Sequence, residues 1–566
     1  MSKSIKEKLA GIAQEYGLGA PAEQTIGNGR NVATGGAAND CIGDLAENSI
    51  GNGAYKQEKE TEDISPGDRI VILPSGKVSI SESAAYIFRR FAPLHTLYYR
   101  GGALVELVEE DDVSFLQVVD PEALRSRVEK LGRVVAWRVG DDGREVLKPT
   151  KMPQSDAKAM VATQEARDLL PRVSSLLNCP VLVEAQDGSL AVLGRGYHHE
   201  LGGLLILSGE RPPEIPVKEA AASLTRLLEE FDFVTPADRS RALAAFITPA
   251  LRIGGFLQGP VPIDVAEADQ SQAGKGYRHN LVRALYNEAG YFVTSRQGGV
   301  GSKDESFAAA LIAGRPFVVL DNFRGRIDSQ HLEAFMTCPD LFPARIPHQR
   351  EVLINPRRFL IQLSSNGVEA TRDLANRSSI VRIRKRTGYV YRDTLGELDS
   401  KQSYYLGCVF AVIRTWVEAG KPRTLRTAHD FREWSGTLDW IVQNLLEAAS
   451  LMEGHESAQE RVSNPAMSWL RLVAQAVERD GKFGRRLAAS DLIDLCELHG
   501  IEVPGTSPSA TEDQFRRQAG VLMRRVFGGT DHVQIDNFSV RRSKESVSRG
   551  SLGGPIEHKT YTFTKS

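Results

Sequence analysis

The sequence has 566 residues, and its 70 Lys and Arg against 72 Asp and Glu give a net charge of −2, so the chain as a whole is not a polycation. Any nucleic-acid surface must therefore be local. Hydrophobic residues make up 41% of the chain and charged residues 25%, which excludes a collagen, a coiled-coil rod and a wholly disordered protein. At roughly 150 residues per domain, the length allows three or four domains.

Cysteine usage and hydropathy predict where the protein is found. The cysteines are odd in number, lie far apart and form no Cys-x-x-Cys pair, which argues against a disulfide framework and a zinc cluster. A reducing compartment suits such a set. No apolar run approaches the roughly 20 residues that cross a bilayer, and the N-terminus lacks the apolar core of a secretory signal. We therefore expect a cytoplasmic protein without a membrane segment.

The chain divides into five predicted segments. Residues 1–65 are rich in Gly, Asn and Ala and are predicted to be flexible, because they contain few side chains that could bury a core. Short alternating strands and a helix predict an α+β domain over 66–210. In 211–395, strands alternate with helices, which is typical of an α/β fold with a parallel sheet. Residues 396–460 are helical by periodicity. Three helices and an antiparallel pair in 461–566 predict a winged helix-turn-helix domain.

A phosphate-binding loop is the strongest chemical signal. An apolar strand over 260–269 leads into a loop that ends in Gly274-Lys275 and then into a helix. In this P-loop arrangement, backbone N–H groups hold phosphates and the lysine reaches the β- and γ-phosphates of a nucleotide such as ATP. Residues predicted to bind the nucleotide are Asp269, Gln270, Ser271, Gln272, Ala273, Gly274, Lys275, Gly276 and Tyr277.

The loop departs from the full P-loop pattern at two positions. Asp269 replaces the first glycine, and Gly276 replaces the Ser or Thr whose hydroxyl is a Mg²⁺ ligand. The alternative interpretation is that Ala-Gly-Lys-Gly is simply a turn that enters a helix. The residues that follow decide between the two.

A carboxylate after the next apolar strand favours the nucleotide site. The strand over 315–323 carries Asp321, 46 residues after Lys275, where a Walker B aspartate holds Mg²⁺. Asn322 stands where an ATPase usually has the Glu that activates water, and an amide positions water without accepting its proton. Asp304 and Glu305 are candidates for that missing base, and a simple turn aspartate is the alternative for Asp321.

Two further polar positions complete the predicted active site. The third strand, over 357–366, ends in Asn366, whose amide can hydrogen-bond the attacking water or the γ-phosphate. Arg377 follows a short helix just before the fourth strand, at 379–386, and from there can reach a neighbouring subunit's γ-phosphate as an arginine finger. Arg372 is its competitor, and both could be ordinary surface arginines.

The order Gly-Lys loop, Leu-Asp-Asn, Ser-Ser-Asn and Asp-Leu-Ala-Asn-Arg resembles the AAA+ ATPase core of phage, plasmid and genomic-island replication proteins, of the superfamily III and primase-associated helicase type, with degenerate Walker motifs. The resemblance covers about 185–450. It implies a ring, often a hexamer, that threads nucleic acid through its centre and binds ATP and Mg²⁺ between subunits. In such a ring Lys275, Asp321 and Asn366 act in cis and Arg377 in trans.

The resemblance also implies a DNA-binding β-hairpin before the third core strand. Two alternating stretches there enclose His348, Gln349 and Arg350 at the predicted turn. Residues 341–390 hold ten Lys and Arg against three Asp and Glu, a local net charge of +7 in a chain whose total is −2. A basic hairpin tip would bind the phosphates of DNA independently of the base sequence. The alternative is a basic face that only contacts solvent.

The C-terminal domain is a second candidate DNA surface. Arginines spaced for one side of a helix suggest a recognition helix, and further basic residues fall at the predicted wing. They are Arg516, Arg517, Arg524, Arg541 and Arg542. Residues 481–566 carry 13 basic against 10 acidic residues, only +3, so a protein-docking role stays open.

Three functions remain as alternatives at this stage. The first is an ATP-dependent DNA helicase or translocase of a mobile genetic element, acting as a ring on single-stranded DNA. The second is an ATP-binding, weakly hydrolysing assembly or loader protein, which Gly276 and Asn322 favour. The third, a transcriptional regulator, has no effector-binding pattern to support it.

Overall fold

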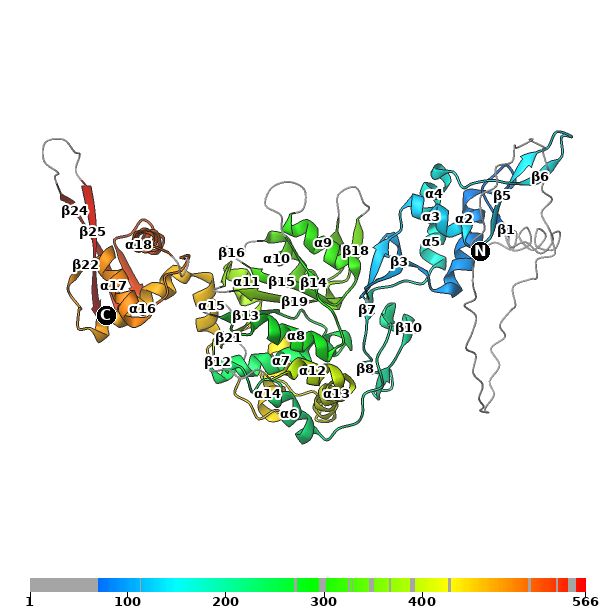
Figure 1. Cartoon of the computed structure of the whole chain (residues 1–566). Coiled ribbons are helices and arrows are strands. Elements are labelled where there is room, and N and C mark those ends of the chain that lie inside the picture. The colour runs from blue at the N-terminus through cyan, green and yellow to red at the C-terminus, as the bar shows by residue number, and fades with distance from the viewer. Residues whose placement is uncertain are drawn as a thin grey trace, which may run out of the picture. The chain divides into compact units, whose positions relative to one another are not determined.

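The computed structural model (Figure 1) describes residues 70–565, apart from 112, 269–271, 295–301, 324–325, 328, 346–350, 366–367, 387–391, 426–428, 507–509, 536–537 and 548–555. These residues form two compact units. The smaller unit comprises 70–94 and 119–169, and the larger unit comprises 95–118 and everything from 170 onward. The predicted domain over 66–210 is thus divided between the two, and the predicted flexible segment 1–65 lies outside the described residues.

The smaller unit packs helices on a three-stranded sheet in the order β1-β5-β6, in which β1 and β5 are parallel. Ser79 and Glu82 form a capping box that fixes the start of the first helix. Its elements are β1 (Ile70–Ile72), α2 (Ile80–Phe91), α3 (Pro121–Glu129), β5 (Arg133–Val139), β6 (Glu145–Pro149), α4 (Gln154–Val161) and α5 (Gln164–Leu169).

Small antiparallel and mixed sheets open the larger unit. A meander of three strands is followed by five short strands in two sheets, orders β10-β11-β7 and β8-β9. The elements are β2 (Leu97–Arg100), β3 (Ala103–Glu110), β4 (Val113–Val118), β7 (Ser175–Leu177), β8 (Val181–Glu184), β9 (Leu190–Leu193), β10 (Gly196–His198) and β11 (Leu204–Ile206).

A six-stranded sheet in the order β12-β21-β13-β19-β15-β14 forms the centre of the larger unit. Every pair is parallel except β12 with β21. Its central strands β13 and β19 are almost entirely buried, as expected for a parallel sheet covered on both faces. This confirms the predicted α/β class. The strands are β12 (Asp232–Phe233), β13 (Ile263–Ala268), β14 (Tyr291–Phe292), β15 (Phe317–Phe323), β19 (Leu360–Ser365) and β21 (Ser378–Arg384).

Helices cover both faces of this sheet (Figure 1). Helices α7 (Pro236–Ile253) and α8 (Lys275–Leu285) lie on one face, and α9 (Lys303–Ala313), α10 (Gln330–Thr337) and α11 (Arg372–Asn376) lie on the other. Right-handed crossovers require this, because the chain moves along the sheet in one direction through α8 and in the opposite direction through the other three. The connections that leave β13 and β19 therefore diverge, and adjacent strands with diverging connections form a crevice at their carboxyl ends.

A β-hairpin is inserted before β19. It pairs β17 (Phe342–Ala344) with β18 (Val352–Ile354), and Phe342 faces Ile354 across the ladder. The Leu353 N–H donates to the Gly101 carbonyl oxygen at 2.8 Å. Gly101 has φ 51°, and a Cβ there would collide with the Leu353 backbone, so only glycine permits this close support of the hairpin.

Helices below the sheet complete the body of the larger unit. Trp416 and Trp434 are buried among them, and Trp434 donates to the Thr248 hydroxyl at 3.0 Å, which joins α14 to α7. These helices are α6 (Val217–Arg226), α12 (Thr394–Ser400), α13 (Gln402–Glu418) and α14 (Arg432–Asn444). Helix α15 (His455–Ser463) follows them in the chain and packs against α11. Across the described ranges, no helix has the length and apolarity needed to cross a membrane.

The C-terminal part has its own core, around Trp469 and Phe563. Three helices pack on a four-stranded antiparallel sheet of order β22-β25-β24-β23. The predicted antiparallel pair is present as β24 and β25. The elements are α16 (Pro465–Arg479), β22 (Arg486–Ala488), α17 (Ala489–His499), α18 (Glu512–Phe527), β23 (His532–Ile535), β24 (Phe538–Val547) and β25 (Ile556–Lys565).

Candidate nucleotide site

Lys275 is the first residue of α8, directly beyond the loop that follows β13. Gly274 caps this helix with φ 90°, and a Cβ there would lie 3.1 Å from a ring carbon of Phe231. The positive φ favours glycine, and any larger residue would crowd the Phe231 ring. The first-turn N–H groups of a helix have no partner within the helix, so this end attracts anions. Asp269, Gln270 and Ser271 lie outside the described residues.

Asp321 lies in a β-bulge at the end of β15. Leu320 pairs with Leu363 and Phe323 with Ser365, so Asp321 and Asn322 together stand opposite Ser364. Asn322 takes φ 48°, a conformation that asparagine tolerates better than most residues. The bulge leaves both side chains exposed, whereas the four preceding residues of the strand are buried.

Ser364 holds this bulge in place, and the sequence did not single it out. Its hydroxyl donates to Asp321 Oδ1 at 2.5 Å and accepts the Asn322 N–H at 2.8 Å. A charge-assisted hydrogen bond of this kind fixes the orientation of the carboxylate. Ser364 is therefore a positioning residue for Asp321. The only signal in the sequence is its place two residues before Asn366.

The fold brings Lys275 and Asp321 to the same edge of the sheet. Strand β19 alone separates β13 from β15, and strands lie about 4.8 Å apart, so the two carboxyl ends are on the order of 10 Å from each other. A lysine side chain and a phosphate chain can bridge that distance. Asn366, predicted at the end of β19 between them, lies outside the described residues.

The candidate bases for water activation also fall near this edge. Asp304 and Glu305 lie in the first turn of α9, and Lys303 beside them is 4.0 Å from the ring of Phe323 at the end of β15. Asp304 accepts a hydrogen bond from Ser329 at 3.0 Å. A further carboxylate, which the sequence did not single out, is Glu267, a buried residue of β13 that accepts the Val368 N–H at 3.1 Å.

Buried arginines fix α8 against the sheet. Arg278 is fully buried and donates to Asp264 of β13 at 2.6 Å, and Arg283 donates to Gln362 of β19 at 2.5 Å. Burial lowers the pKa of Arg283 to about 10, and the charge of Asp321 opposes that shift. These contacts tie the helix that carries Lys275 to two adjacent strands.

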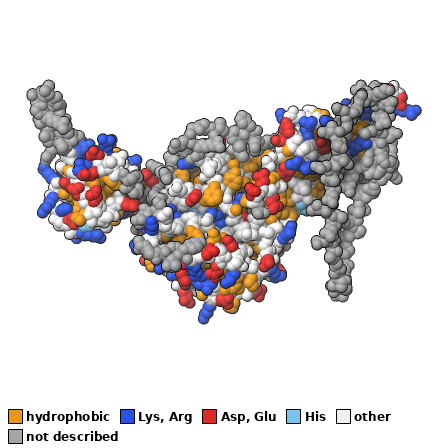
Figure 2. All heavy atoms as spheres, in the orientation of Figure 1, with side chains coloured by type: hydrophobic (Ala, Val, Ile, Leu, Met, Phe, Trp, Pro, Cys, Tyr) orange, Lys and Arg blue, Asp and Glu red, His pale blue; other side chains and the backbone are white. Residues whose placement is uncertain are grey.

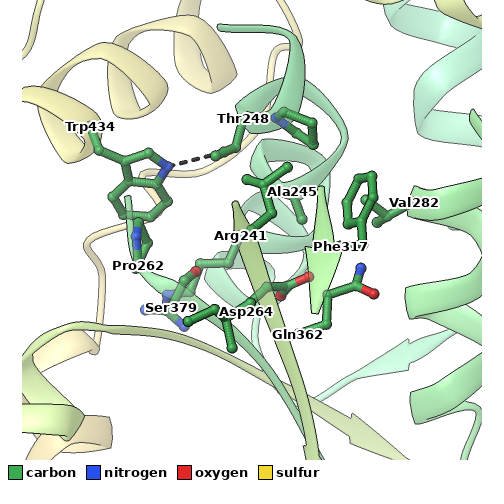
Figure 3. A pocket seen from close by; sticks show the side chains of 13 residues that line it. Arg241, Ala245, Thr248, Pro262, Asp264, Val282, Phe317, Gln362, Ser379 and Trp434 are labelled. Carbon is green, nitrogen blue, oxygen red and sulfur yellow. Dashed lines mark hydrogen bonds between the residues drawn. The ribbon is translucent and has the colours of Figure 1, made fainter. Parts of the chain in front are cut away.

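A small cavity of about 30 Å³ lies beneath the middle of the sheet (Figure 3). Asp264 and Gln362 line it together with Thr248 and Trp434. It is large enough for one water molecule, and one oxygen of Asp264 has no hydrogen-bond partner among the described residues. Because Asp264 is the second residue of β13, the cavity lies away from the carboxyl edge and is not the nucleotide site.

Arg377 is engaged within its own chain. Its guanidinium donates to the Glu333 carbonyl oxygen at 3.5 Å and lies 3.9 Å from the Asp373 carboxylate, and its side chain is 19% exposed. Its competitor Arg372 is exposed on the same short helix and has no ion-pair partner in the described part of the chain. As an arginine finger, Arg377 would first have to leave Glu333 and Asp373, whereas Arg372 would not.

The predicted DNA contacts are placed unequally. His348, Gln349 and Arg350 lie outside the described residues, although both strands of their hairpin are present. Arg517, Arg524 and Arg541 are exposed, and Arg516 pairs with Glu512.

Arg542 has a structural role instead. Its side chain is 9% exposed, pairs with Asp531 at 2.8 Å and stacks on Phe527.

Comparison with protein-family models finds no match, and comparison with curated proteins finds none either. Among solved structures, the apo A form of the NrS-1 C-terminal region aligns over 83% of this chain and 96% of that chain, at 10% identity and a TM-score of 0.34. The active helicase Cch of SCCmec type IV aligns over 81% and 90%, at 10% identity and a TM-score of 0.27. A JCV helicase bound to a phenoxyphenyl acetamide aligns over 44% and 73%, at 13% identity and a TM-score of 0.21. Such TM-scores carry no argument, so the function must be inferred from this chain's own residues.

Proposed function

We propose that this chain is an ATP-dependent DNA helicase or translocase with an AAA+ core, of the type used in the replication of mobile genetic elements. One observation carries the proposal. Lys275 begins a glycine-capped helix directly beyond the loop after β13, and Asp321 lies at the end of β15. The two strands belong to one sheet, and only β19 lies between them. That is the arrangement a P-loop ATPase needs to hold a triphosphate and its Mg²⁺.

The residues of the site have distinct roles in this proposal. Lys275 and the first turn of α8 bind the phosphates, together with the loop before them. Asp321, oriented by Ser364, holds Mg²⁺. Asn322 and Asn366 orient the attacking water, and Glu305 is a candidate to accept its proton. Arg377 or Arg372 completes the site of a neighbouring subunit, which requires a ring, and the type of ATPase proposed favours a hexamer.

Two surfaces would contact DNA. The hairpin between β17 and β18 would place His348, Gln349 and Arg350 against a single strand in the ring's channel, because residues 341–390 carry a net charge of +7. The C-terminal part, in which three helices pack on an antiparallel sheet, would act as a winged helix. Its acidic and basic side chains are intermixed on the face shown in Figure 2, so its affinity for DNA is expected to be modest.

A second function follows from two of the three departures in the motifs. Gly276 offers no hydroxyl to Mg²⁺, and Asn322 offers no base. Both favour an ATP-binding, weakly hydrolysing assembly or loader protein that uses the nucleotide to build a ring on DNA rather than to move along it.

Measurements of ATP turnover and of native mass, each with and without single-stranded DNA, separate these functions. The motor predicts turnover that rises several-fold with DNA and a multimer in the presence of ATP. The loader predicts the same multimer with turnover that DNA leaves unchanged. A chain that binds no nucleotide would contradict both.

Replacing Gly276 by Ser is expected to raise Mg²⁺-dependent turnover about tenfold, or 1.4 kcal/mol of transition-state stabilisation. A Cβ at Gly276 meets no atom within 4 Å, so the serine fits and supplies the missing Mg²⁺ ligand. Steady-state ATPase assays at several Mg²⁺ concentrations measure the effect. Gly520→Ser, in the open middle of α18, is the matched control and should leave turnover unchanged. An unchanged turnover in Gly276→Ser would show that the missing hydroxyl does not limit hydrolysis.

A further inference from the structure

A second pocket lies at the base of the β17–β18 hairpin, with a volume of about 190 Å³. Its walls are the end of α7, the segment before β13, the end of α10 and the segment before β19. Pro339 and Pro356, which line it, come just before β17 and just after β18. Because its walls precede β13 and β19, the pocket lies at the amino ends of these strands, the opposite end from Lys275. The volume far exceeds the roughly 10–15 Å³ that a single water needs.

Arginines dominate the charge of this pocket. Arg252 and Arg357 line it, and the charges of Arg357 and Arg358 both act on Arg252. Arg252 is 6% exposed, and its Nε has no hydrogen-bond partner among the described residues, although its Nη1 donates to the Gly259 carbonyl oxygen. Burial, with the repulsion of Arg357 and Arg358, lowers the pKa of Arg252 to about 10, and the charge of Glu433 opposes part of that shift. A buried cation left partly unpaired is costly unless an anion completes it.

The nearby carboxylate is already used. Glu433 accepts the Gly259 N–H at 2.5 Å and pairs with Arg423 at 2.9 Å. Arg252 and Arg357 are the only charged side chains that line the pocket, and no Asp or Glu among the described residues lines it. Asp340 follows Pro339 in the sequence but does not line the pocket. The pocket therefore has unmatched positive charge, a buried arginine donor and an exposed arginine at its mouth, Arg357.

We propose that this pocket binds a phosphate group of the nucleic-acid backbone, on the strand that the hairpin engages. The inference rests on the proposed function. Arginine suits this ligand because its planar guanidinium binds phosphate oxygens in pairs. The pocket lies where the hairpin joins the body, and the β2–β3 turn supports that hairpin through Gly101. A strand held by the hairpin tip would thus have a second, buried contact at the hairpin's base. Free inorganic phosphate is the other source of the same chemistry.

Titration of a fluorescent single-stranded oligonucleotide against the full chain tests this inference. Arg357→Ala removes an exposed arginine and should not impair folding. We expect it to weaken binding about three- to tenfold and to reduce the slope of log affinity against log salt by about 0.7, the contribution of one phosphate contact on a single strand. Arg211→Ala, which removes an exposed arginine elsewhere in the larger unit, is the matched control and should change neither quantity.

Cys338 gives a direct measurement at the pocket. It lines the pocket and is partly exposed, whereas the other three cysteines in the described part of the chain are buried. We expect bound oligonucleotide to slow the alkylation of Cys338 several-fold, as followed by peptide mass mapping, and to protect it much less in Arg357→Ala. Inorganic phosphate at equal ionic strength should not protect it. Protection by inorganic phosphate alone would overturn the assignment to a strand.

Failure of this inference is distinguishable from failure of the proposed function. If the wild-type chain binds the oligonucleotide, and Arg357→Ala binds it with the same affinity and salt slope, the phosphate pocket is wrong while the motor stands. If the wild-type chain binds ATP but no oligonucleotide at low salt, both the pocket and the DNA motor are wrong.

Discussion

Lys275→Ala is expected to lower ATP turnover by about 10²–10³-fold, the usual cost of removing a group that stabilises charge in the transition state. Lys275 is 9% exposed at the start of α8, where the helix dipole and a lysine charge both act on an anion. ATP turnover and the affinity for a fluorescent ATP analogue measure the loss. Both should fall, since in the proposed site the lysine contacts the phosphates before and during the reaction.

Lys218→Ala is the control for this experiment, because Lys218 is an exposed residue of α6. It should retain the turnover of the wild-type chain. Circular dichroism and native mass identify a variant that has simply unfolded. A folded Lys275→Ala chain that still binds ATP and hydrolyses it at half the wild-type rate would show that Lys275 does not act on the phosphates.

Acidification from pH 7.5 to 5.0 is expected to destabilise the larger unit by about 2 kcal/mol per histidine of a buried pair. His429 and His455 stack at 4.9 Å and are each no more than 3% exposed. Burial, with the nearby charge of Arg241, lowers the pKa of His429 to about 4, and burial with His429 and Arg241 lowers that of His455 to about 3.

The sign of this effect follows from where each state binds protons. An unfolded histidine has a pKa of about 6.5. Between pH 6.5 and about 4, these two histidines bind protons in the unfolded chain but stay neutral in the folded chain. The free energy of unfolding therefore falls as the pH drops below 6.5. Above pH 6.5 the histidine pair makes its full contribution to stability.

Denaturant unfolding at the two pH values measures this loss. His455→Phe should show an acid-induced loss about 2 kcal/mol smaller than the wild-type chain, whatever its stability at pH 7.5. His532→Gln changes an exposed histidine of β23 and should keep the wild-type loss. Equal losses in all three chains would show that the pair is not buried as a neutral stack.

The central sheet could be predicted because its strands contain short runs of β-branched and other apolar residues, such as Phe317–Leu320, between polar segments. The stretches predicted over 260–269, 315–323, 357–366 and 379–386 became β13, β15, β19 and β21 with only small shifts at their ends. A strand that is buried on both faces can be recognised from such a run even when its partner strands are unknown. The proximity of Lys275 and Asp321 could be predicted as well, because each follows or ends such a strand and parallel strands have their carboxyl ends at one edge of the sheet.

The N-terminal organisation could not be predicted in the same way. Alternation predicted strands near 95–110, but the pattern does not say which surface a half-buried strand will cover. The meander of β2, β3 and β4 belongs to the larger unit, although the helix before it and the helix after it belong to the smaller one.

Fine geometry within the site also depends on long-range pairing. The bulge at Asp321 and Asn322 exists only in the register between β15 and β19, so Ser364 had no local signal as its partner. The contact of Arg377 with the Glu333 carbonyl oxygen joins residues 44 positions apart. The convergence of Arg252 and Arg357 likewise requires the folded chain.

The most direct test of the account is a structure of the chain with Mg²⁺ and a non-hydrolysable ATP analogue. We predict a triphosphate at the carboxyl edge of β13 and β19, with its β- and γ-oxygens within hydrogen-bonding distance of Lys275 Nζ and its Mg²⁺ held on the side of Asp321. A nucleotide bound elsewhere in the chain, or one whose phosphates lie beyond the reach of Lys275, would contradict the central claim.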